Sequence, residues 1–514
     1  KEECAVLDVR EAGEFADGHL LFAASAPLGV FEMRLLDLVP MPLARLVLVD
    51  DGLSGRAGRA ARLAFALGYA HVTCLEGGTA AWAQAGFTLF EGVYVPSKVF
   101  GELVHETFAV AHISAQELVT WQDEGRSFLL LDGRPFEEHR RMNIPGSVCL
   151  PNGELPYRIG TILHDSQTPV VIHCAGRTRS IIGAQILKEL GLKNPVFALN
   201  NGTQGWALAN FPLERGSTRM VGEKPGAADQ EAMAGKARSA AAHWNIPLVD
   251  AKTATDWAND PTRTTYFFDV RSEEEFADDG IPGSVHAPGG QLLQSTDSWA
   301  AVRGARMVLI DPMEVRAVTA ARWLSQMGWD CHVLTGGREG WGEILLPERR
   351  RLPEVNVPVQ ASLVSPGSTI LDMRASQLFR ESHIEGARWT LRSRLAAVVS
   401  DLDKRSSIIL CGDREMAGRI AADLGEAGYY DLAYLAGEPA EWRAMGHALV
   451  ATPDDPKDHE AADFVFFTHD RHSGNMEAAR TYLAWETGLV ARLDEQERKQ
   501  YRMESVSPLP FGMG

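Results

Sequence analysis

Short apolar runs alternate with amphipathic stretches along most of the chain, and one such pair is especially clear. Residues 169–172 form an apolar, β-branched run, which is typical of a strand inside a parallel sheet covered on both faces. Residues 180–190 have helical periodicity, with Ser180 as a favourable N-cap and Gly191 directly after the end. The apolar stripe of this helix consists of Ile182, Ile186, Leu187 and Leu190. The pattern predicts a strand, a short loop and a helix, as in an α/β fold.

This pattern recurs, so we expect four copies of one α/β unit. Each copy has a strand that ends in Asp-x-Arg, at residues 8–10, 132–134, 269–271 and 372–374. Each copy closes with a glycine-containing turn before a tryptophan, namely Trp82, Trp206, Trp341 and Trp442. The predicted domains are 1–95, 96–216, 217–351 and 352–452, each a parallel sheet flanked by helices, followed by a C-terminal helical extension over 453–514. Residues 475–498 of this extension are expected to clamp part of the protein or to mediate a homodimer.

Cys174 begins the loop between the predicted strand and helix of the second copy. The loop reads Cys174, Ala175, Gly176, Arg177, Thr178, Arg179 and Ser180. The positive end of a helix and two guanidinium groups favour a thiolate at its start. The backbone N–H groups of residues 175–180 are expected to point inward and to bind an anion. These features predict a cysteine nucleophile that acts on an anionic substrate.

Not every copy keeps this cysteine. Alignment on the glycines that end the helices gives, as equivalent residues, Asp51, Cys174, Asp311 and Cys411. A carboxylate cannot replace a thiolate nucleophile, so we expect the first and third copies to be structural units that wall the cleft of their partner. The loop after Cys411 has two carboxylates and one arginine, and an anionic substrate would bind there less well. Cys174 is therefore predicted as the principal catalytic residue and Cys411 as a second candidate.

Together, the Asp-x-Arg strand, the Ile-Pro-Gly turn at 144–146 and 281–283, the cysteine loop and the tryptophan ending resemble the rhodanese, or sulfurtransferase, family across about residues 1–450. The resemblance implies four tandem rhodanese-like domains and an enzyme of the thiosulfate:cyanide sulfurtransferase type. Cys174 would take sulfur from thiosulfate or a related donor as a persulfide, held by the loop amides, while Arg177 and Arg179 orient the donor. A thiol acceptor would then remove the sulfur. The resemblance implies no metal and no organic cofactor.

Two other classes of function stay open on the sequence. A non-catalytic scaffold of rhodanese-like modules is compatible with the two copies that lack the cysteine. A cysteine phosphatase or an arsenate reductase also places His-Cys before an anion-binding loop. Phosphatases of that kind have arginine six residues after the cysteine, where this chain has Ser180. Both loop arginines are retained beside Cys174, which favours the transferase over the scaffold.

Charge and composition limit the kinds of partner and the cellular location that we expect. The chain has 50 Lys and Arg against 68 Asp and Glu, a net charge of −18, which argues against nucleic acid or an anionic membrane as a main partner. No apolar run reaches about 18 residues, and the six cysteines include no C-x-x-C pair, so we expect a cytoplasmic protein. Residues 95–112, 216–242 and 352–360 are predicted as linkers, and the second of these separates two semi-independent pairs of domains.

Overall fold

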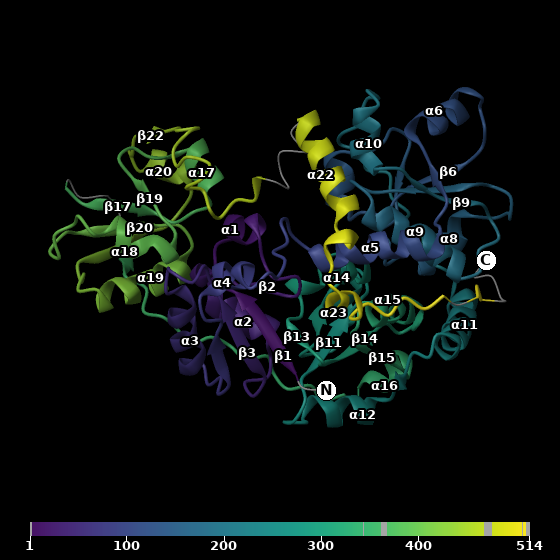
Figure 1. Cartoon of the computed structure of the whole chain (residues 1–514), viewed down its shortest axis with the longest axis horizontal. Coiled ribbons are helices and arrows are strands. Elements are labelled where there is room, and N and C mark those ends of the chain that lie inside the picture. The colour runs from purple at the N-terminus through teal and green to yellow at the C-terminus, as the bar shows by residue number, and fades with distance from the viewer. Residues whose placement is uncertain (1–2, 343, 361–366, 467–474, 506, 510–514) are drawn as a thin grey trace.

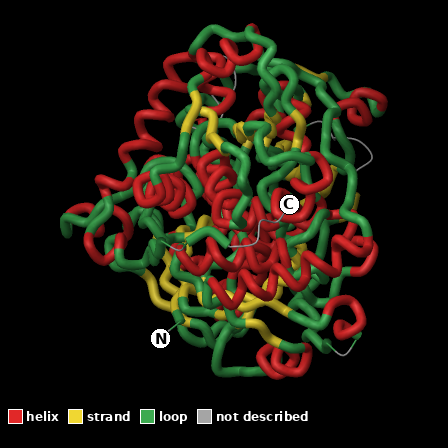
Figure 2. Tube along the Cα trace, turned by 90° about the vertical axis from the view of Figure 1, so that its right-hand side faces the viewer, coloured by secondary structure: helices red, strands yellow, loops and turns green. Residues whose placement is uncertain are grey.

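The computed structural model describes residues 3–342, 344–360, 367–466, 475–505 and 507–509 (Figure 1). Its strands form four main sheets, one in each copy, and we call the copies unit 1 (1–95), unit 2 (96–216), unit 3 (217–351) and unit 4 (352–452). Helices pack beside the strands, as the view turned by 90° also shows (Figure 2). The predicted α/β class and the tandem repeat are confirmed, whereas the domain boundaries stay predictions.

Unit 2 shows the arrangement that the units share. Its sheet is parallel throughout, in the order β5-β9-β8-β6-β7. The strands are β5 (His112–Ile113), β6 (Leu129–Asp132), β7 (Val148–Cys149), β8 (Val170–His173) and β9 (Val196–Leu199). The helices are α6 (Ala115–Asp123), α7 (Phe136–Arg141), α8 (Leu155–Ile162), α9 (Thr178–Glu189) and α10 (Gly202–Leu208). Because the strands are parallel, the loops after β6 and β8 meet at one edge of the sheet.

Units 3 and 4 repeat this strand order, as β10-β15-β14-β11-β12 and β16-β21-β20-β17-β19. The strands of unit 3 are β10 (Leu248–Val249), β11 (Thr265–Asp269), β12 (Val285–His286), β14 (Arg306–Ile310) and β15 (Asp330–Leu334). Its helices are α12 (Ala251–Ala258), α13 (Glu273–Asp279), α14 (Gly289–Gln294), α15 (Val315–Gln326) and α16 (Gly337–Trp341). The strands of unit 4 are β16 (Val359–Gln360), β17 (Thr369–Asp372), β19 (Arg388–Trp389), β20 (Ile408–Cys411) and β21 (Leu432–Leu435), with a separate pair β18 (His383–Ile384) and β22 (Leu449–Val450). Its helices are α17 (Ser376–Glu381), α18 (Leu395–Val398), α19 (Arg414–Glu426) and α20 (Pro439–Ala444).

The sheet of unit 1 includes a strand from unit 3. Its own strands are β1 (Cys4–Asp8), β2 (Ala24–Ser25), β3 (Arg45–Val49) and β4 (Val72–Cys74). Its helices are α1 (Ala12–Asp17), α2 (Phe31–Leu38), α3 (Arg56–Ala66) and α4 (Gly78–Gln84). The short strand β13 (Val302–Arg303) runs antiparallel beside β1. Tyr266 strengthens this junction, because its hydroxyl donates to the Leu38 carbonyl at 2.6 Å and accepts from the Val302 N–H at 3.1 Å.

The hydrophobic core joins units 1, 2 and 3 and leaves unit 4 apart. One continuous cluster of buried side chains contains residues of all three units, such as Leu7, Leu131 and Phe268. Unit 4 has its own clusters and lies beside unit 1 at one end of the molecule (Figure 1). Arg392 of unit 4 holds Glu32 of unit 1 at 2.8 Å. The prediction of two semi-independent pairs is therefore wrong, because three units share one core.

Two of the three predicted linkers contain helices. Helix α5 (Val95–Phe108) is largely buried and packs along α9, and α11 (Ala227–His243) packs along α15. Alanine is the strongest helix former, which explains why the alanine-rich stretch 227–243 is helical despite Gly235. Because both segments pack against the units, they fix the units relative to one another.

The C-terminal extension crosses back over units 1 and 2. Helix α22 (Met476–Gly488) lies beside α10 and α5 (Figure 1), and α23 (Glu495–Arg498) follows after a 3₁₀ turn (Val490–Arg492). The predicted helix over 475–498 is thus interrupted, since Asp494 caps a new helix. The expected clamp is confirmed, and the homodimer stays a prediction. No helix in the described ranges is both long and apolar enough to cross a membrane.

Candidate active site

Cys174 lies at the carboxyl end of β8, where the sequence predicts it. All four residues of β8 are buried, and Cys174 is 2% exposed. Helix α9 begins at Thr178 with Arg177 as its N-cap, so the prediction that Ser180 is the N-cap is wrong. The Ser180 hydroxyl instead donates to the Arg177 carbonyl at 2.8 Å and lies 3.7 Å from the Cys174 sulfur. The helix therefore starts almost directly above the thiol, and its positive end faces the loop.

The start of α10 holds the backbone of this loop. The Cys174 carbonyl accepts a hydrogen bond from the Thr203 N–H at 2.9 Å. Gly202 permits the close approach, because its φ is +50° and an added Cβ would lie 2.1 Å from the Cys174 oxygen. Within the described ranges, the backbone N–H groups of residues 175–180 have no hydrogen-bond acceptor. Such a set of unpaired donors at a helix N-terminus forms a nest for an anion.

The two loop arginines have different surroundings. Arg179 lines the cavity at Cys174 and pairs with Glu138 through two hydrogen bonds of 2.6 and 2.8 Å. Burial opposes its charge, but Glu138 raises the pKa of Arg179 above its usual value, so it stays a cation. Arg177 makes an equivalent pair with Glu102 of α5, at 2.6 and 2.8 Å. Arg177 is not among the residues that line the cavity, so the structure does not support its expected contact with the donor.

A cavity of about 520 Å³ opens above Cys174, with walls from units 1, 2 and 3 and from the C-terminal extension. The cationic residues in the described part of its lining are Arg34, Lys98, Arg134, Arg141, Arg179 and Arg215. The acidic residues in the same lining are Glu138 and Asp297. This excess of positive charge attracts anionic ligands. Units 1 and 3 thus both wall the site of unit 2, whereas the sequence predicts that unit 3 walls unit 4.

Helix α22 covers the active loop. Its Glu486 is fully buried, accepts a hydrogen bond from the Thr178 hydroxyl at 2.7 Å, and lies 3.3 Å from the Lys98 ammonium group. Its Tyr482 lines the cavity. A Cβ added to Gly176 would lie 3.0 Å from Glu486, which shows how closely the helix approaches the loop. The sequence gives no signal for this contact, because nothing in the local pattern shows where α22 docks.

A buried polar network supports the loop from below. Asp132 accepts hydrogen bonds from the Arg134 guanidinium at 2.7 and 2.9 Å and lies 3.0 Å from Nδ1 of His139. His173, directly before the nucleophile, is fully buried and lies 3.9 Å from Asp132. Burial lowers the pKa of His173 to about 4, so the ring is neutral at pH 7 and packs inside the sheet. Arg134 both pairs with Asp132 and lines the cavity.

Cys411 does not occupy the position of Cys174. The strand register pairs Asp132 with His173 and Asp372 with Cys411, so Cys411 is the equivalent of His173, and Gly412 follows in the nucleophile position. Cys411 is 1% exposed and lies in an apolar cluster with isoleucine and tryptophan side chains. Burial raises the pKa of its thiol well above the usual range. The alignment on glycines is wrong here because this loop is one residue shorter, and the structure does not support Cys411 as a catalytic residue.

The alignment is also shifted in unit 1. The Thr79 N–H donates to the Asp50 carbonyl at 2.9 Å, as Thr203 does to Cys174, so Asp50 rather than Asp51 is the equivalent residue. The loop of unit 1 is one residue longer. The prediction that unit 1 has a carboxylate in place of the cysteine still holds.

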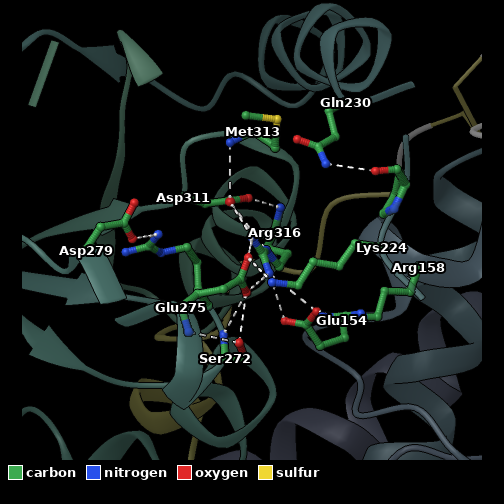
Figure 3. Close-up of polar contacts among 12 residues, drawn as sticks. Glu154, Arg158, Lys224, Gln230, Ser272, Glu275, Asp279, Asp311, Met313 and Arg316 are labelled. Carbon is green, nitrogen blue, oxygen red and sulfur yellow. Dashed lines mark hydrogen bonds and ion pairs between the residues drawn. The ribbon is translucent and has the colours of Figure 1, made fainter. Parts of the chain in front are cut away.

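In unit 3, Asp311 stands at the nucleophile position, and Arg316 fills the loop. The Arg316 guanidinium donates to Asp311 at 2.9 Å, to Glu275 at 2.7 Å and to Glu154 of unit 2 at 3.1 Å (Figure 3). It also lies over the ring of Tyr157, 4.2 Å from the centroid. This loop is therefore closed by its own ion pairs and attaches unit 3 to unit 2.

Comparison with known proteins agrees with this geometry. The model of the rhodanese-like domain family matches residues 1–85, 114–209 and 250–344, which together make up more than half of the chain. The chain belongs to the rhodanese-like domain family. The rhodanese-like units matched are units 1, 2 and 3, and unit 4 shares the strand order of units 2 and 3.

The whole chain also has a solved relative. It is 36% identical to thiosulfate sulfurtransferase from Pseudomonas aeruginosa, with a TM-score of 0.89, over 98% of this chain and 97% of that one. Over 98 residues it is 30% identical to a putative sulfur carrier protein of Bacillus subtilis, and over 107 residues 29% identical to an HTH-type transcriptional regulator of Mycobacterium tuberculosis. These matches cover 19–20% of this chain and 51% and 45% of those relatives, so the chain spans about half the length of each.

Proposed function

We propose that the protein is a sulfurtransferase that takes the sulfane sulfur of thiosulfate, or of a related persulfide donor, onto Cys174. The position of this thiol carries the proposal: it lies at a strand end, below the unpaired N–H groups of residues 175–180 and beside the Arg179 guanidinium. A site with these donors suits a small dianion. The similarity to a thiosulfate sulfurtransferase over nearly the whole chain supports the same class of donor.

The reaction has two steps and passes through a covalent intermediate. The Cys174 thiolate attacks the outer sulfur of thiosulfate, the sulfur–sulfur bond of the donor breaks, and sulfite leaves with the bonding electron pair. Arg179 and the loop N–H groups stabilise the negative charge that moves onto the leaving group. Cys174 then carries a persulfide. In the second step a thiophilic acceptor, a thiol or cyanide, attacks the outer sulfur and restores the Cys174 thiolate.

The experiment is intact-mass analysis of the protein after incubation with thiosulfate, together with the amount of sulfite released. The parent protein should gain one sulfur atom and release one equivalent of sulfite, and Cys174→Ser should do neither. Cys411→Ser and Cys149→Ser are matched controls, because both thiols are buried in their sheets, and both variants should load normally. Sulfur uptake that survives in Cys174→Ser contradicts the assignment. If no sulfane donor loads the parent protein, the non-catalytic scaffold becomes the better interpretation.

A further inference from the structure

Part of the cavity wall around Cys174 comes from units that lack a nucleophile. Arg34 of α2, Tyr94 directly before α5, and Asp297 and Ser298 of the 3₁₀ helix Thr296–Ser298 all line the cavity. The Arg34 guanidinium donates to the Ser298 carbonyl at 3.2 Å. We call these four residues the cross-unit cluster, since they bring units 1 and 3 together at one place in the site.

Asp297 is the carboxylate of the cross-unit cluster. It forms no ion pair within the described part of the chain, although Arg34 lies near enough to favour its charged form. Burial raises the pKa of Asp297 to about 7, and Arg34 opposes this rise only in part. The ionisable groups that face it are Arg34, Tyr94 and Tyr501 of the extension. A carboxyl group with such a pKa both accepts and releases protons near neutral pH.

Tyr94 has a strained backbone next to this carboxyl group. Its φ of +58° and ψ of +33° lie in the left-handed region, which a bulky side chain rarely adopts. Strain of this kind persists where the surrounding structure imposes it and is common at functional sites. Burial and Asp297 raise the pKa of Tyr94, so its hydroxyl stays protonated and can donate a hydrogen bond. The strained residue therefore lies where a proton donor, Tyr94, and a proton acceptor, Asp297, both line the cavity.

The cavity also has more room and more positive charge than a small dianion uses. Its volume of about 520 Å³ is in the range of pockets that hold drug-sized ligands. Arg141 and Arg215 line it as exposed side chains and have no acidic partner in the described ranges. Arg34 adds a third positive charge in unit 1. With a donor at Cys174, these cations remain available for a second, larger anion.

We propose that the cross-unit cluster is the acceptor subsite, which binds a small thiol that carries carboxylates: Arg34 binds a carboxylate and Asp297 removes the thiol proton. This inference rests on the proposed sulfur transfer by Cys174. The Asp297 carboxylate takes the proton, and the new thiolate attacks the outer sulfur of the Cys174 persulfide. The sulfur–sulfur bond to Cys174 breaks, and its electron pair restores the Cys174 thiolate. The acceptor leaves as its own persulfide, and Asp297 returns the proton to water.

The test separates the two half-reactions. Protein loaded from thiosulfate is mixed with an acceptor, and the loss of bound sulfur is followed by intact mass in a single turnover. The acceptors are glutathione, which has two carboxylates, 2-mercaptoethanol, which has none, and sulfite, which above neutral pH has no proton to lose. Asp297→Asn keeps the shape of the side chain, and Asp278→Asn, an exposed residue of α13, is the matched control.

Asp297→Asn should load normally and react normally with sulfite, but should transfer sulfur to glutathione roughly 100-fold more slowly at pH 7. The parent rate should rise with pH through about 7, as Asp297 ionises, whereas the variant rate should follow the ionisation of the thiol alone. Arg34→Gln should raise the half-saturating concentration of glutathione roughly tenfold, with little effect on 2-mercaptoethanol.

The outcomes distinguish this inference from the function on which it rests. A parent protein that takes up no sulfur contradicts the proposed function before any acceptor is added. Normal loading followed by an equal loss of transfer to sulfite and glutathione would mean that Asp297 only shapes the cavity. That result, or an unchanged rate with glutathione in Asp297→Asn, overturns the acceptor subsite.

Discussion

Removal of the Arg316 guanidinium should weaken the contact between units 2 and 3 by about 3 kcal/mol. The Arg316 side chain is 1% exposed and pairs with three carboxylates, Asp311, Glu275 and Glu154. Loss of one partner from a buried ion pair costs roughly 3–5 kcal/mol, because it leaves a buried charge without compensation. We expect the lower end of this range for Arg316→Met, since the Glu154 side chain is 13% exposed and can be hydrated.

Hydrogen exchange read by mass spectrometry measures this loss locally, in α15 and α8. Where local opening limits exchange, about 3 kcal/mol corresponds to roughly 100-fold faster exchange. Arg349→Met is the matched control, because Arg349 of unit 3 also pairs with a carboxylate of another unit, Asp37 of unit 1, but the two side chains are 49% and 51% exposed. A pair of that kind contributes at most about 1 kcal/mol. Less than about threefold acceleration in Arg316→Met, or equal acceleration in both variants, would refute the reasoning.

The sign of the pH dependence follows from Glu275. Burial alone would raise its pKa, but Arg316 lowers it to about 2, below the ordinary value of 4.5. A carboxyl group with a depressed pKa stabilises the folded state above its unfolded pKa, and this stabilisation is lost as the pH falls through the folded pKa. The advantage of the parent protein over Arg316→Met should therefore be full above about pH 4.5 and should shrink toward pH 2.

Four further substitutions test the site and the role of Cys411. Arg179→Gln removes the loop arginine that lines the cavity, so initial rates of sulfite release should fall roughly 10- to 100-fold. An unchanged rate would mean that the backbone N–H groups of the loop bind the donor without help from Arg179. Cys411→Ala should not alter sulfur loading, read by intact mass, but should lower the urea midpoint, since it leaves a small void in the core of unit 4. Glu486→Gln should slow loading several-fold in single turnover, because it weakens the contact of α22 with Thr178. If Thr178→Val adds its full effect to that of Glu486→Gln, the two side chains do not act through one contact.

Local patterns were enough to predict the strand, loop and helix around Cys174. The apolar run before it and the period of the helix after it are both local signals, and each lies within a residue or two of the element that forms. The predicted equivalence of Cys411 with Cys174 is wrong because counting back from a distant glycine assumes that the two loops have equal length. The strand register, which depends on pairing with a neighbouring strand, gives the correct alignment of Cys411.

The walls of the cavity could not be predicted in the same way. Arg34 and Asp297 lie in units 1 and 3, and their meeting above Cys174 depends on how three units share one core. No periodicity or motif encodes that docking. The same is true of α22, whose Glu486 is fully buried against the loop. An acidic side chain in an amphipathic helix is expected to face solvent, and the contact of Glu486 with Thr178 and Lys98 reverses this expectation.

The antiparallel pairing of β1 with β13 has a consequence for synthesis of the chain. Cys4 pairs with Arg303, so the sheet of unit 1 reaches its final form only after most of unit 3 has left the ribosome. At roughly 5–20 residues per second, this delay is about 15–60 s. During that time the Cys4–Ala5 end of one edge of β1 is available to other strands, which is a hazard for aggregation. We therefore expect chaperones that shield strand edges to bind nascent chains that stop before residue 302 and to release those that extend past unit 3.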